Sequence, residues 1–401
     1  MMHQVYTVKV EPLNFIFFSP HFPAYGQEFC HHLNRNGVRV LGIGDAPFDE
    51  LSGKLQASLT EYYRIADMEN DDEVIRAVGY FIHRYGKIDR FESLNEHWLE
   101  LEARIRTDFN IYGTKLDFID NLKQKSKMKD YFVRSGVSTV AHLKSSDKTS
   151  ALQFIDQVGF PIVVKPDLGS GASMTYKIST PREFDSFFSN KPADIPFILE
   201  EYIDGIILTY DGLIDRYGHV VFATSHRFEQ SIMEVVNTDS HLYYFCLPAI
   251  DPEIEEAGRN ILKAMDIRER FFHIELFQRR RDNKIIALEV NMRPPGAWMT
   301  DAINFTHDMD IYEEWANMVA HNRTGGPFPG KYFTGYASRK HRLDYRYSHQ
   351  DIVGTWHADL VKYQEVETVF RRAMGDFAYQ FRAGSLDRVR EIVAFIHELR
   401  V

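Results

Sequence analysis

Hydrophobic positions along the 401-residue chain alternate between the periods of strands and of helices. In the first hundred residues, short apolar strands are predicted at 14–18, 38–43 and 88–92, and the clearest helical pattern between them covers 71–84. Strands that alternate with helices predict a parallel sheet, so we expect residues 1–111 to form a Rossmann-like α/β domain. The loop after the first strand has no GxGxxG pattern, which argues against a dinucleotide site there.

The pattern changes near residue 112. Amphipathic helices predicted at 126–135 and 150–158 each end next to a glycine, and a strand at 161–165 leads into a glycine-bearing turn. Further strands are predicted at 197–201, 206–214, 219–224, 271–278 and 284–291, and a helix near 254–265. We expect a second domain over 112–325, with lobes at about 122–198 and 199–325, and an α+β C-terminal region over 326–401. That region begins in the linker Gly325–Gly330 and closes with a helix carrying Leu386, Val389, Val393, Ile396 and Leu399 at helical spacing.

Composition narrows the class of protein. The net charge of −10 argues against a broad nucleic-acid-binding surface. The two cysteines, Cys30 and Cys246, are too few for a disulfide framework and lack zinc spacing, which favours a reducing compartment. Apolar runs stay well short of the roughly 18 residues that span a bilayer, and the first residues lack a secretory signal pattern. We therefore expect a cytoplasmic protein without a membrane or nucleic-acid partner.

A phosphate site is predicted where the strand 161–165 ends. Lys165 closes this apolar strand, and Gly169, Ser170 and Gly171 follow in the turn. A lysine supplies a positive charge, and small residues leave backbone N–H groups open to phosphate oxygens. The turn is not a Walker loop, because no GKT or GKS precedes a helix. A plain turn between two strands is the alternative reading.

Carboxylates inside two apolar strands predict a cation site. With a period of two, Glu289 and Asn291 share a face with Ala287, opposite Leu288, and Glu275 shares a face with His273 on the preceding strand. A buried carboxylate must be paired or must bind a cation, and two carboxylates with an amide oxygen suit Mg²⁺ bound with ATP phosphates. The alternative is a salt bridge for each carboxylate, with Arg279, Arg280, Arg281 or Arg293 as candidate partners.

Arg293 stands just after the second of these strands. Pro294-Pro295-Gly296 follows it and makes a rigid exit from the strand. A guanidinium held there is suited to clamp a transferring phosphate or a substrate carboxylate through two hydrogen bonds. A structural ion pair with Glu289 is the alternative.

Four segments, in this order, resemble the ATP-grasp superfamily over roughly residues 112–324. They are Lys125-Ser126-Lys127-Met128-Lys129 ending at Ser135-Gly136-Val137; Phe160 to Pro166 with Gly169-Ser170-Gly171; Ile198-Leu199-Glu200-Glu201-Tyr202-Ile203-Asp204-Gly205; and His273-Ile274-Glu275 followed by Leu288-Glu289-Val290-Asn291-Met292-Arg293. Each segment is weak by itself, and the ordered set is specific.

The resemblance implies a role for each matching residue. Lys125 and Lys165 match the two nucleotide-binding lysines, and Gly169, Ser170 and Gly171 match the loop that closes over the β- and γ-phosphates. Glu200, together with the backbone of Glu201 and Ile203, matches the segment that reads adenine. Glu275, Glu289 and Asn291 match ligands of Mg²⁺ (or Mn²⁺), and Arg293 matches a catalytic or substrate-anchoring arginine. One position departs from the pattern: Ile207 stands where many relatives have a glutamate for the ribose, so that Asp204 or Asp211 becomes the candidate for this contact.

The activity that the resemblance implies is ATP-dependent ligation of a carboxylate to an amine. ATP phosphorylates the carboxylate, an amine attacks the acylphosphate, and ADP and phosphate leave; the similarity is greatest to L-amino-acid ligases and carnosine synthase. His273, His307 and Asp308 are candidates for a general base, and the segment after Gly296, with Trp298 and Asp301, is expected to shape the substrate pocket. Small-molecule substrates are expected, and a homodimer is compatible with the resemblance.

Three alternatives stay open. One is a carboxylase-type enzyme that phosphorylates bicarbonate, although the chain has no Met-Lys-Met segment for biotin attachment. The second is a synthetase that makes a thioester or modifies a peptide. The third is a nucleotide-binding protein without catalysis, and the presence of Glu275, Glu289 and Asn291 argues against it.

Overall fold

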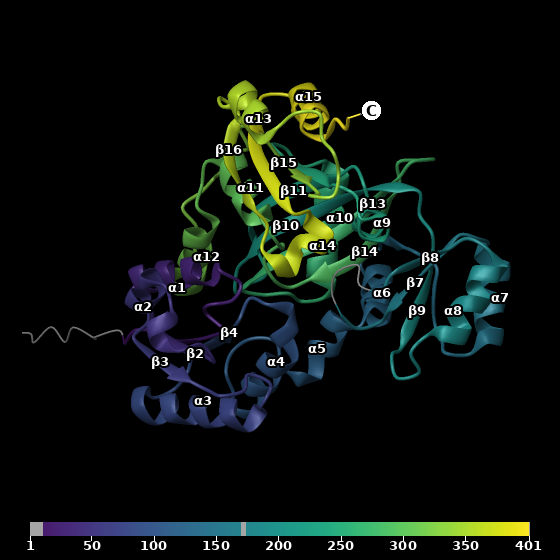
Figure 1. Ribbon diagram of the computed structural model, residues 1–401. Helices are drawn as coiled ribbons and strands as arrows, with labels where there is room; N and C mark the ends of the chain where they lie inside the picture. The colour runs from purple at the N-terminus through teal and green to yellow at the C-terminus, as the bar shows by residue number, and fades with distance from the viewer. Residues whose placement is uncertain (1–10, 170–173, 401) are drawn as a thin grey trace, which may run out of the picture. The chain divides into compact units, whose positions relative to one another are not determined.

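A computed structural model describes residues 11–169 and 174–400, which form two compact units. The first unit combines residues up to 119 with 312–325, and the second combines 120–311 with 326–401. Figure 1 labels the elements along the chain. Each unit has its own sheets and core, so each is described separately.

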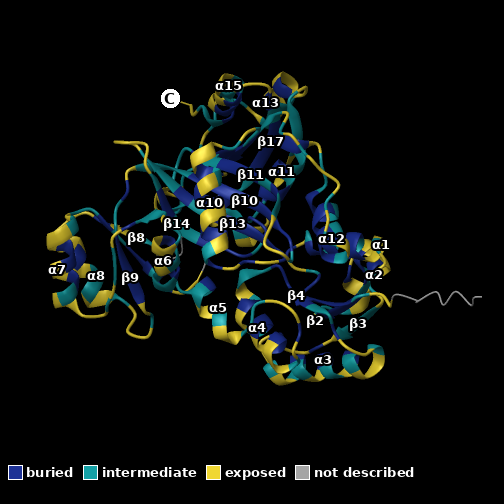
Figure 2. Cartoon of the chain, turned by 180° about the vertical axis from the view of Figure 1, so that it is seen from behind, coloured by how far each residue is buried: buried dark blue, intermediate teal, exposed yellow. Residues whose placement is uncertain are grey.

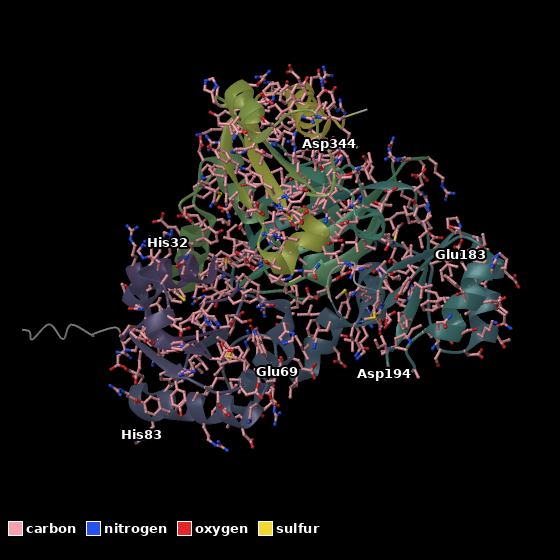
Figure 3. All side chains as sticks on the ribbon, viewed as in Figure 1. His32, Glu69, His83, Glu183, Asp194 and Asp344 are labelled. Carbon is pink, nitrogen blue, oxygen red and sulfur yellow. The ribbon has the colours of Figure 1, made fainter. Side chains whose placement is uncertain are left out.

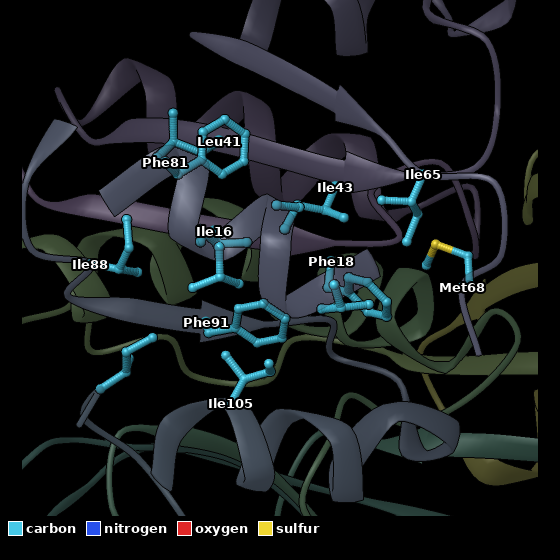
Figure 4. Packing of buried hydrophobic residues seen from close by; sticks show 14 residues of the cluster. Ile16, Phe18, Leu41, Ile43, Ile65, Met68, Phe81, Ile88, Phe91 and Ile105 are labelled. Carbon is cyan, nitrogen blue, oxygen red and sulfur yellow. The ribbon is translucent and has the colours of Figure 1, made fainter. Parts of the chain in front are cut away.

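The first unit is built on a parallel sheet in the order β3-β2-β1-β4. Its strands are β1 (Asn14–Phe18), β2 (Arg39–Gly44), β3 (Glu61–Arg64) and β4 (Arg90–Glu92), and its helices are α1 (Gly26–Arg35), α2 (Gly53–Ser58), α3 (Asp71–Tyr85), α4 (Leu99–Asp108) and, from later in the chain, α12 (Ile311–His321). The apolar residues of β1, β2 and α3 meet in one core, which Figure 4 shows around Ile16, Leu41 and Phe81. The strands and helices alternate as the sequence pattern predicts.

Helix α12 is part of this unit although just over 200 residues separate it from α4. The ring of Trp315 lies edge-on to Phe15 and Phe29, with centroids 5.7 and 5.0 Å apart, and Tyr312 lies 4.9 Å from Phe29. Phe15 and Phe29 are fully buried in this packing. The aromatic side chains of α12 thus complete the core that α1 and β1 begin.

A buried ion cluster fixes the end of the first unit. Arg106 of α4 is fully buried, and its Nη2 lies 2.7 Å from Glu102 Oε2 and 2.8 Å from Glu92 Oε1. The same guanidinium donates to the carbonyl oxygens of Phe91 and Thr114. One arginine therefore joins α4, β4 and the segment that leaves the unit.

The second unit contains a small sheet in the order β6-β9-β7-β8. Its strands are β6 (His142–Lys144), β7 (Ile162–Pro166), β8 (Tyr176–Ile178) and β9 (Phe197–Glu201), and its helices are α7 (Lys148–Val158) and α8 (Pro181–Asn190). Phe154 and Phe184 pack the helices onto Val164 and Leu199. The outward faces of both helices are exposed (Figure 2), and Glu183, whose carboxylate accepts from Ser179 N at the start of α8, is labelled in Figure 3.

A nine-stranded sheet in the order β16-β17-β15-β12-β11-β10-β13-β14-β5 forms the rest of this unit. Its strands are β5 (Ser138–Thr139), β10 (Gly205–Ile214), β11 (Val220–Phe228), β12 (Tyr243–Leu247), β13 (Arg270–Arg279), β14 (Ile285–Asn291), β15 (Phe333–Arg339), β16 (Leu360–Glu365) and β17 (Phe377–Ala383). The helices are α5 (Leu116–Lys123, at the boundary of the units), α6 (Lys125–Arg134), α9 (Ile232–Thr238), α10 (Pro252–Ala264), α11 (Met299–His307), α13 (His349–Trp356), α14 (Arg371–Met374) and α15 (Leu386–His397).

The C-terminal residues extend this sheet. β15 pairs with β12 on one side and with β17 on the other, and α15 packs on it through Val389, Ile392 and Ile396. Leu399, which the helical spacing included, lies beyond the end of α15 and is exposed. Among the described residues, no helix has the length and apolar character needed to cross a membrane.

We expect Arg106→Met to lower the free energy of unfolding by about 3–5 kcal/mol, because it leaves two carboxylates in the core without their cation. Denaturant titration of the full chain measures this change. Arg104→Met on the same helix is the matched control, because Arg104 forms an exposed pair with Asp71 and contributes little. Equal stability of the two variants would contradict the structural role of the cluster.

Candidate active site

Two neighbouring strands bring the predicted carboxylates together. β13 and β14 are antiparallel, and their register places Glu275 directly opposite Glu289 and His273 directly opposite Asn291. Side chains at opposite positions of such a pair lie on the same face of the sheet. The structure therefore places Glu275, Glu289 and Asn291 in one group. All three line a cavity of ≈ 310 Å³ in the second unit.

The strand register is interrupted next to this group. A shift between Glu275 and Leu276 pairs Leu276 with Ala287, which leaves Leu288 as the extra residue of a bulge. Leu288 lines the cavity, and Ala287 is fully buried instead. The expectation that Leu288 points away from Glu289 is therefore wrong, because strict alternation ends at the bulge.

Helix α6 carries two lysines into the same region. Its first turn is fixed by Asp167, whose Oδ1 accepts from Ser126 N at 2.7 Å and whose backbone oxygen accepts from Lys125 N. Lys125 Nζ lies 3.7 Å from Glu289 Oε1 and 2.5 Å from Gly169 O. One turn later, Lys129 is fully buried. The capped start of α6 thus sets where both ammonium groups lie.

Glu200 of β9 binds two lysines. Its Oε2 lies 2.8 Å from Lys165 Nζ at the end of β7, and its Oε1 lies 2.9 Å from Lys129 Nζ. Lys129 also donates to Leu288 O of β14 at 2.7 Å. Burial raises the pKa of Glu200, but the two ammonium groups outweigh it and lower that pKa to about 2. Glu200 is therefore ionised at neutral pH.

The chain then passes along the cavity from one sheet to the other. Glu201, Tyr202, Ile203 and Asp204 follow Glu200 and line the cavity, and Gly205 begins β10. Phe228 at the end of β11 and residues 231–234 at the start of α9 also line the cavity. Asp204 lines the cavity but is mostly exposed, so it stands at the rim. Its Oδ1 lies 3.3 Å from Arg280 Nε.

Arg293 also lines the cavity, two residues beyond Asn291. Its Nη1 donates to Pro294 O at 3.0 Å, which holds the guanidinium close to the rigid exit from β14. Burial raises the pKa of Glu275, but His273, Lys165 and Arg293 lower it below its usual range. The cavity thus combines ionised carboxylates with several fixed cations.

The structure brings together most of the predicted site residues. The members that line the cavity are Lys125, Lys165, Glu200, Glu201, Ile203, Glu275, Glu289, Asn291 and Arg293. Gly169 contacts Lys125 through its carbonyl oxygen and has a φ of +108°, which favours glycine. Ser170 and Gly171 lie outside the described residues.

Several other candidates lie elsewhere. Asp211 is fully buried between two histidines and does not line the cavity, so it is excluded as the ribose contact. All three general-base candidates are also outside the cavity lining. His307 bonds Thr224 Oγ1 and Phe328 O, Asp308 pairs with Lys331 and Arg382, and His273 reaches the cavity only through its contact with Glu275.

The segment expected to shape the substrate pocket does not contribute to the cavity lining either. Lys362 Nζ lies 4.3 Å from the centre of the Trp298 ring and 2.5 Å from Asp301 Oδ2, so both side chains pack against β16.

Sequence reasoning missed Lys129 and the stretch from Phe228 to Glu234. A signal for Lys129 existed, because it follows Lys125 by four residues and therefore lies on the same helical face. The β11–α9 stretch carries no comparable signal, since its place at the cavity depends on the pairing of Phe228 with Ile207 across β10 and β11.

Comparison with known proteins gives consistent results. The model of the ATP-grasp domain family matches residues 158–301. The L-arginine-specific L-amino acid ligase of Bacillus subtilis is 23% identical over 297 residues, which cover 71% of this chain and 70% of that protein. The crystal structure of the L-amino acid ligase from Bacillus licheniformis aligns with a TM-score of 0.70 and 14% identity, covering 95% of this chain and 96% of that one. The crystal structure of N5-carboxyaminoimidazole synthetase from Staphylococcus aureus aligns with a TM-score of 0.70 and 12% identity, covering 96% of this chain and 97% of that one.

At these identities, the likeness to the solved structures shows a shared fold. Together the comparisons confirm the predicted α/β and α+β fold class and the resemblance to the ATP-grasp superfamily.

We expect Lys129→Met to lower the free energy of unfolding by about 3 kcal/mol, because it leaves the buried Glu200 Oε1 and Leu288 O without their donor. Lys127→Met is the matched control on α6, since Lys127 forms an exposed pair with Asp120. Denaturant titration compares the two variants. Equal stability would contradict the role of Lys129, and adding Glu200→Gln to Lys129→Met is expected to restore part of the loss.

Proposed function

The chain carries an ATP-grasp domain, and from the site within it we propose that the protein is an ATP-dependent ligase that joins a carboxylate to an amine. The observation that carries this proposal is the register of β13 and β14, which sets Glu275 against Glu289 in a cavity that Lys125 and Lys165 also line. Partly exposed carboxylates beside fixed lysines suit a triphosphate bound with a divalent cation. L-Amino acid ligases among the similar proteins support the same class of reaction.

The nucleotide is proposed to lie along the segment between the two sheets. Lys125 and Lys165 neutralise its phosphates, with the loop from Gly169 covering the β- and γ-phosphates. The backbone of Glu201 and Ile203 reads the adenine edge. Because both carboxylate oxygens of Glu200 lie within ion-pair distance of a lysine, we propose that Glu200 acts mainly by holding Lys165 in place.

The donor set fits a hard divalent cation. Glu275, Glu289 and Asn291 offer two carboxylates and an amide oxygen on one face of the sheet, and oxygen ligands of this kind are preferred by Mg²⁺ and Mn²⁺. When bound, the cation supplies neutralisation of the charge that spreads over the phosphoryl oxygens. The protein's own part is to hold these oxygens in register and to keep Lys125 3.7 Å from Glu289.

The reaction then follows in two transfers. A carboxylate oxygen of the substrate attacks the γ-phosphorus, the bond to the β,γ-bridging oxygen breaks, and ADP leaves. An amine attacks the acyl carbon of the acylphosphate, loses a proton and releases phosphate. Arg293 is proposed to orient the substrate carboxylate or the transferring phosphoryl group, because its planar guanidinium can form two parallel hydrogen bonds to either.

Ribose recognition is assigned to Asp204. Ile207 has no polar group for the ribose, and Asp211 is enclosed in the sheet. Asp204 stands at the rim of the cavity, immediately beyond the adenine segment. A carboxylate at this place is suited to accept hydrogen bonds from the ribose hydroxyls.

We expect Glu289→Gln to abolish ATP turnover while the chain stays folded, because the change removes a charged ligand with almost no change in volume. The measurement is ADP release with Mg²⁺ over a panel of amino acids, singly and in pairs, with hydroxylamine as a trap for the acylphosphate. Circular dichroism checks the fold, and Glu253→Gln on α10, outside the cavity lining, is the control.

Normal turnover by folded Glu289→Gln would overturn the metal assignment. For the wild-type chain, ADP release that requires a particular pair of amino acids supports the proposed ligase activity. Release with bicarbonate alone would instead favour a carboxylase-type reaction, and nucleotide binding without any release would favour a binding protein.

We expect Asp204→Asn to reduce the preference for ATP over 2′-deoxyATP, because the amide is a weaker acceptor for the ribose hydroxyl. Apparent KM values for the two nucleotides, measured with wild type and variant, give this preference. Asp282→Asn is the control, since Asp282 pairs with Arg279 and does not line the cavity. A preference that Asp204→Asn leaves intact would point to Glu229, another carboxylate of the lining.

A further inference from the structure

A row of buried polar side chains leads away from Glu275 into the large sheet. His273 Nε2 lies 3.3 Å from Glu275 Oε1, and His273 Nδ1 lies 2.6 Å from Asp211 Oδ1 on β10. The other oxygen, Asp211 Oδ2, lies 2.6 Å from His226 Nδ1 on β11. The row thus crosses three adjacent strands, β13, β10 and β11, and ends at Glu275 in the cavity.

The strand register places the row on a single face. Asp211 is paired with His273, and Thr209 is paired with Glu275. Thr209 Oγ1 donates to Asp211 Oδ2 and accepts from His226 N at 2.9 Å. His273, Asp211 and His226 are therefore each held by at least two polar contacts inside the sheet.

The chemistry of Asp211 sets the direction of the hydrogen bonds. An ionised carboxylate only accepts, so both imidazole Nδ1 atoms donate to it. With its Nδ1 held by Asp211, the His273 ring has one orientation, in which Nε2 faces Glu275 Oε1. Because both ring nitrogens face carboxylates, His273 is an imidazolium that donates to each of them. One oxygen of Glu275 is then bound by Nε2–H, and the second is left for another ligand.

Asp211 itself has no direct access to substrate. It is 0% exposed, and so is His226. A fully buried aspartate is costly in a sheet and is tolerated where it is fully hydrogen-bonded, as it is here. A buried residue outside the cavity lining can act on the chemistry only through its neighbours.

We propose that Asp211 and His226 are positioning residues that act through His273 to hold the Glu275 carboxylate in the orientation that binds the divalent cation. This inference rests on the metal role proposed for Glu275. Residues that hydrogen-bond to a metal-binding side chain fix its orientation, and removing them typically weakens metal binding by about 10–100-fold. His226 contributes by fixing Asp211 Oδ2, so that Oδ1 stays directed at His273.

The test is a titration of the full chain, saturated with ADP, with Mn²⁺. Electron paramagnetic resonance measures the concentration of free Mn²⁺ at each point, and the bound fraction follows from it. We expect Glu275→Gln to abolish the site and Asp211→Asn to weaken Mn²⁺ binding about 10-fold. Thr334→Val is the matched control: it removes a buried hydrogen bond to Thr306 from the same sheet and is expected to cost stability without changing Mn²⁺ affinity. A weakening by Thr334→Val equal to that by Asp211→Asn would overturn the inference, because general loosening of the sheet would then explain both.

A double-mutant cycle tests whether Asp211 acts through His273. If it does, Asp211→Asn weakens Mn²⁺ binding in the wild-type background and adds little in a His273→Phe background. Additive losses would overturn the proposed route.

His226 supplies an independent pair of variants if Asp211→Asn does not fold. Asparagine places its amide nitrogen near the position of Nδ1, so His226→Asn is expected to retain Mn²⁺ affinity while His226→Leu loses it. Equal affinities for these two variants would overturn the inference.

The same titration separates this inference from the proposed function. If Glu275→Gln binds Mn²⁺ as tightly as wild type, the metal site itself is misassigned and both fail. If Glu275→Gln loses binding but Asp211→Asn binds normally, the metal site stands and only the positioning role of Asp211 is refuted.

Discussion

The pairing of Glu200 with Lys129 and Lys165 is the constraint on which the second unit depends. A carboxylate that is 2% exposed must keep its cations, since separating them would leave a bare charge away from water. Lys165 belongs to the small sheet and Lys129 to α6, and Lys129 also binds the backbone of β14 in the large sheet. One ionic group therefore joins both sheets and the helix between them, and the cavity lies where they meet.

The large sheet also contains a buried carboxylate that is held by basic side chains. Its central strands carry a polar layer in which Asp211 is shared by two histidines and Glu275 faces Glu289. Burial opposes the charged form of His273, but Asp211 raises the pKa of His273 to about 9. The acidic and basic groups thus keep each other ionised, and the sheet presents charge at the cavity without exposing its interior to solvent.

Much of this arrangement follows from sequence. The apolar strands 14–18 and 284–291, the helix 71–84 and the alternating positions of Glu289 and Asn291 are set by local pattern, and the structure has them close to the predicted bounds. The edge strand β3 (Glu61–Arg64) was missed because its sequence, Glu-Tyr-Tyr-Arg, contains no aliphatic residue.

Other features depend on long-range pairing that local pattern does not carry. The bulge at Leu288 depends on the register with β13, and the burial of Asp211 depends on histidines 15 and 62 residues away. The residues that α12 packs against, Phe15 and Phe29, also lie far away in the sequence. No local periodicity therefore assigns this helix to the first unit.

That assignment has a consequence for how the chain is made. During synthesis the residues of the first unit emerge first, but Trp315 and Tyr312 leave the ribosome only after nearly 200 further residues. Until then Phe15 and Phe29 lack part of their covering, and a nascent chain with uncovered aromatic surface is prone to misassociation. The first unit therefore cannot reach its final packing as an N-terminal fragment, before residues 312–325 have been synthesised.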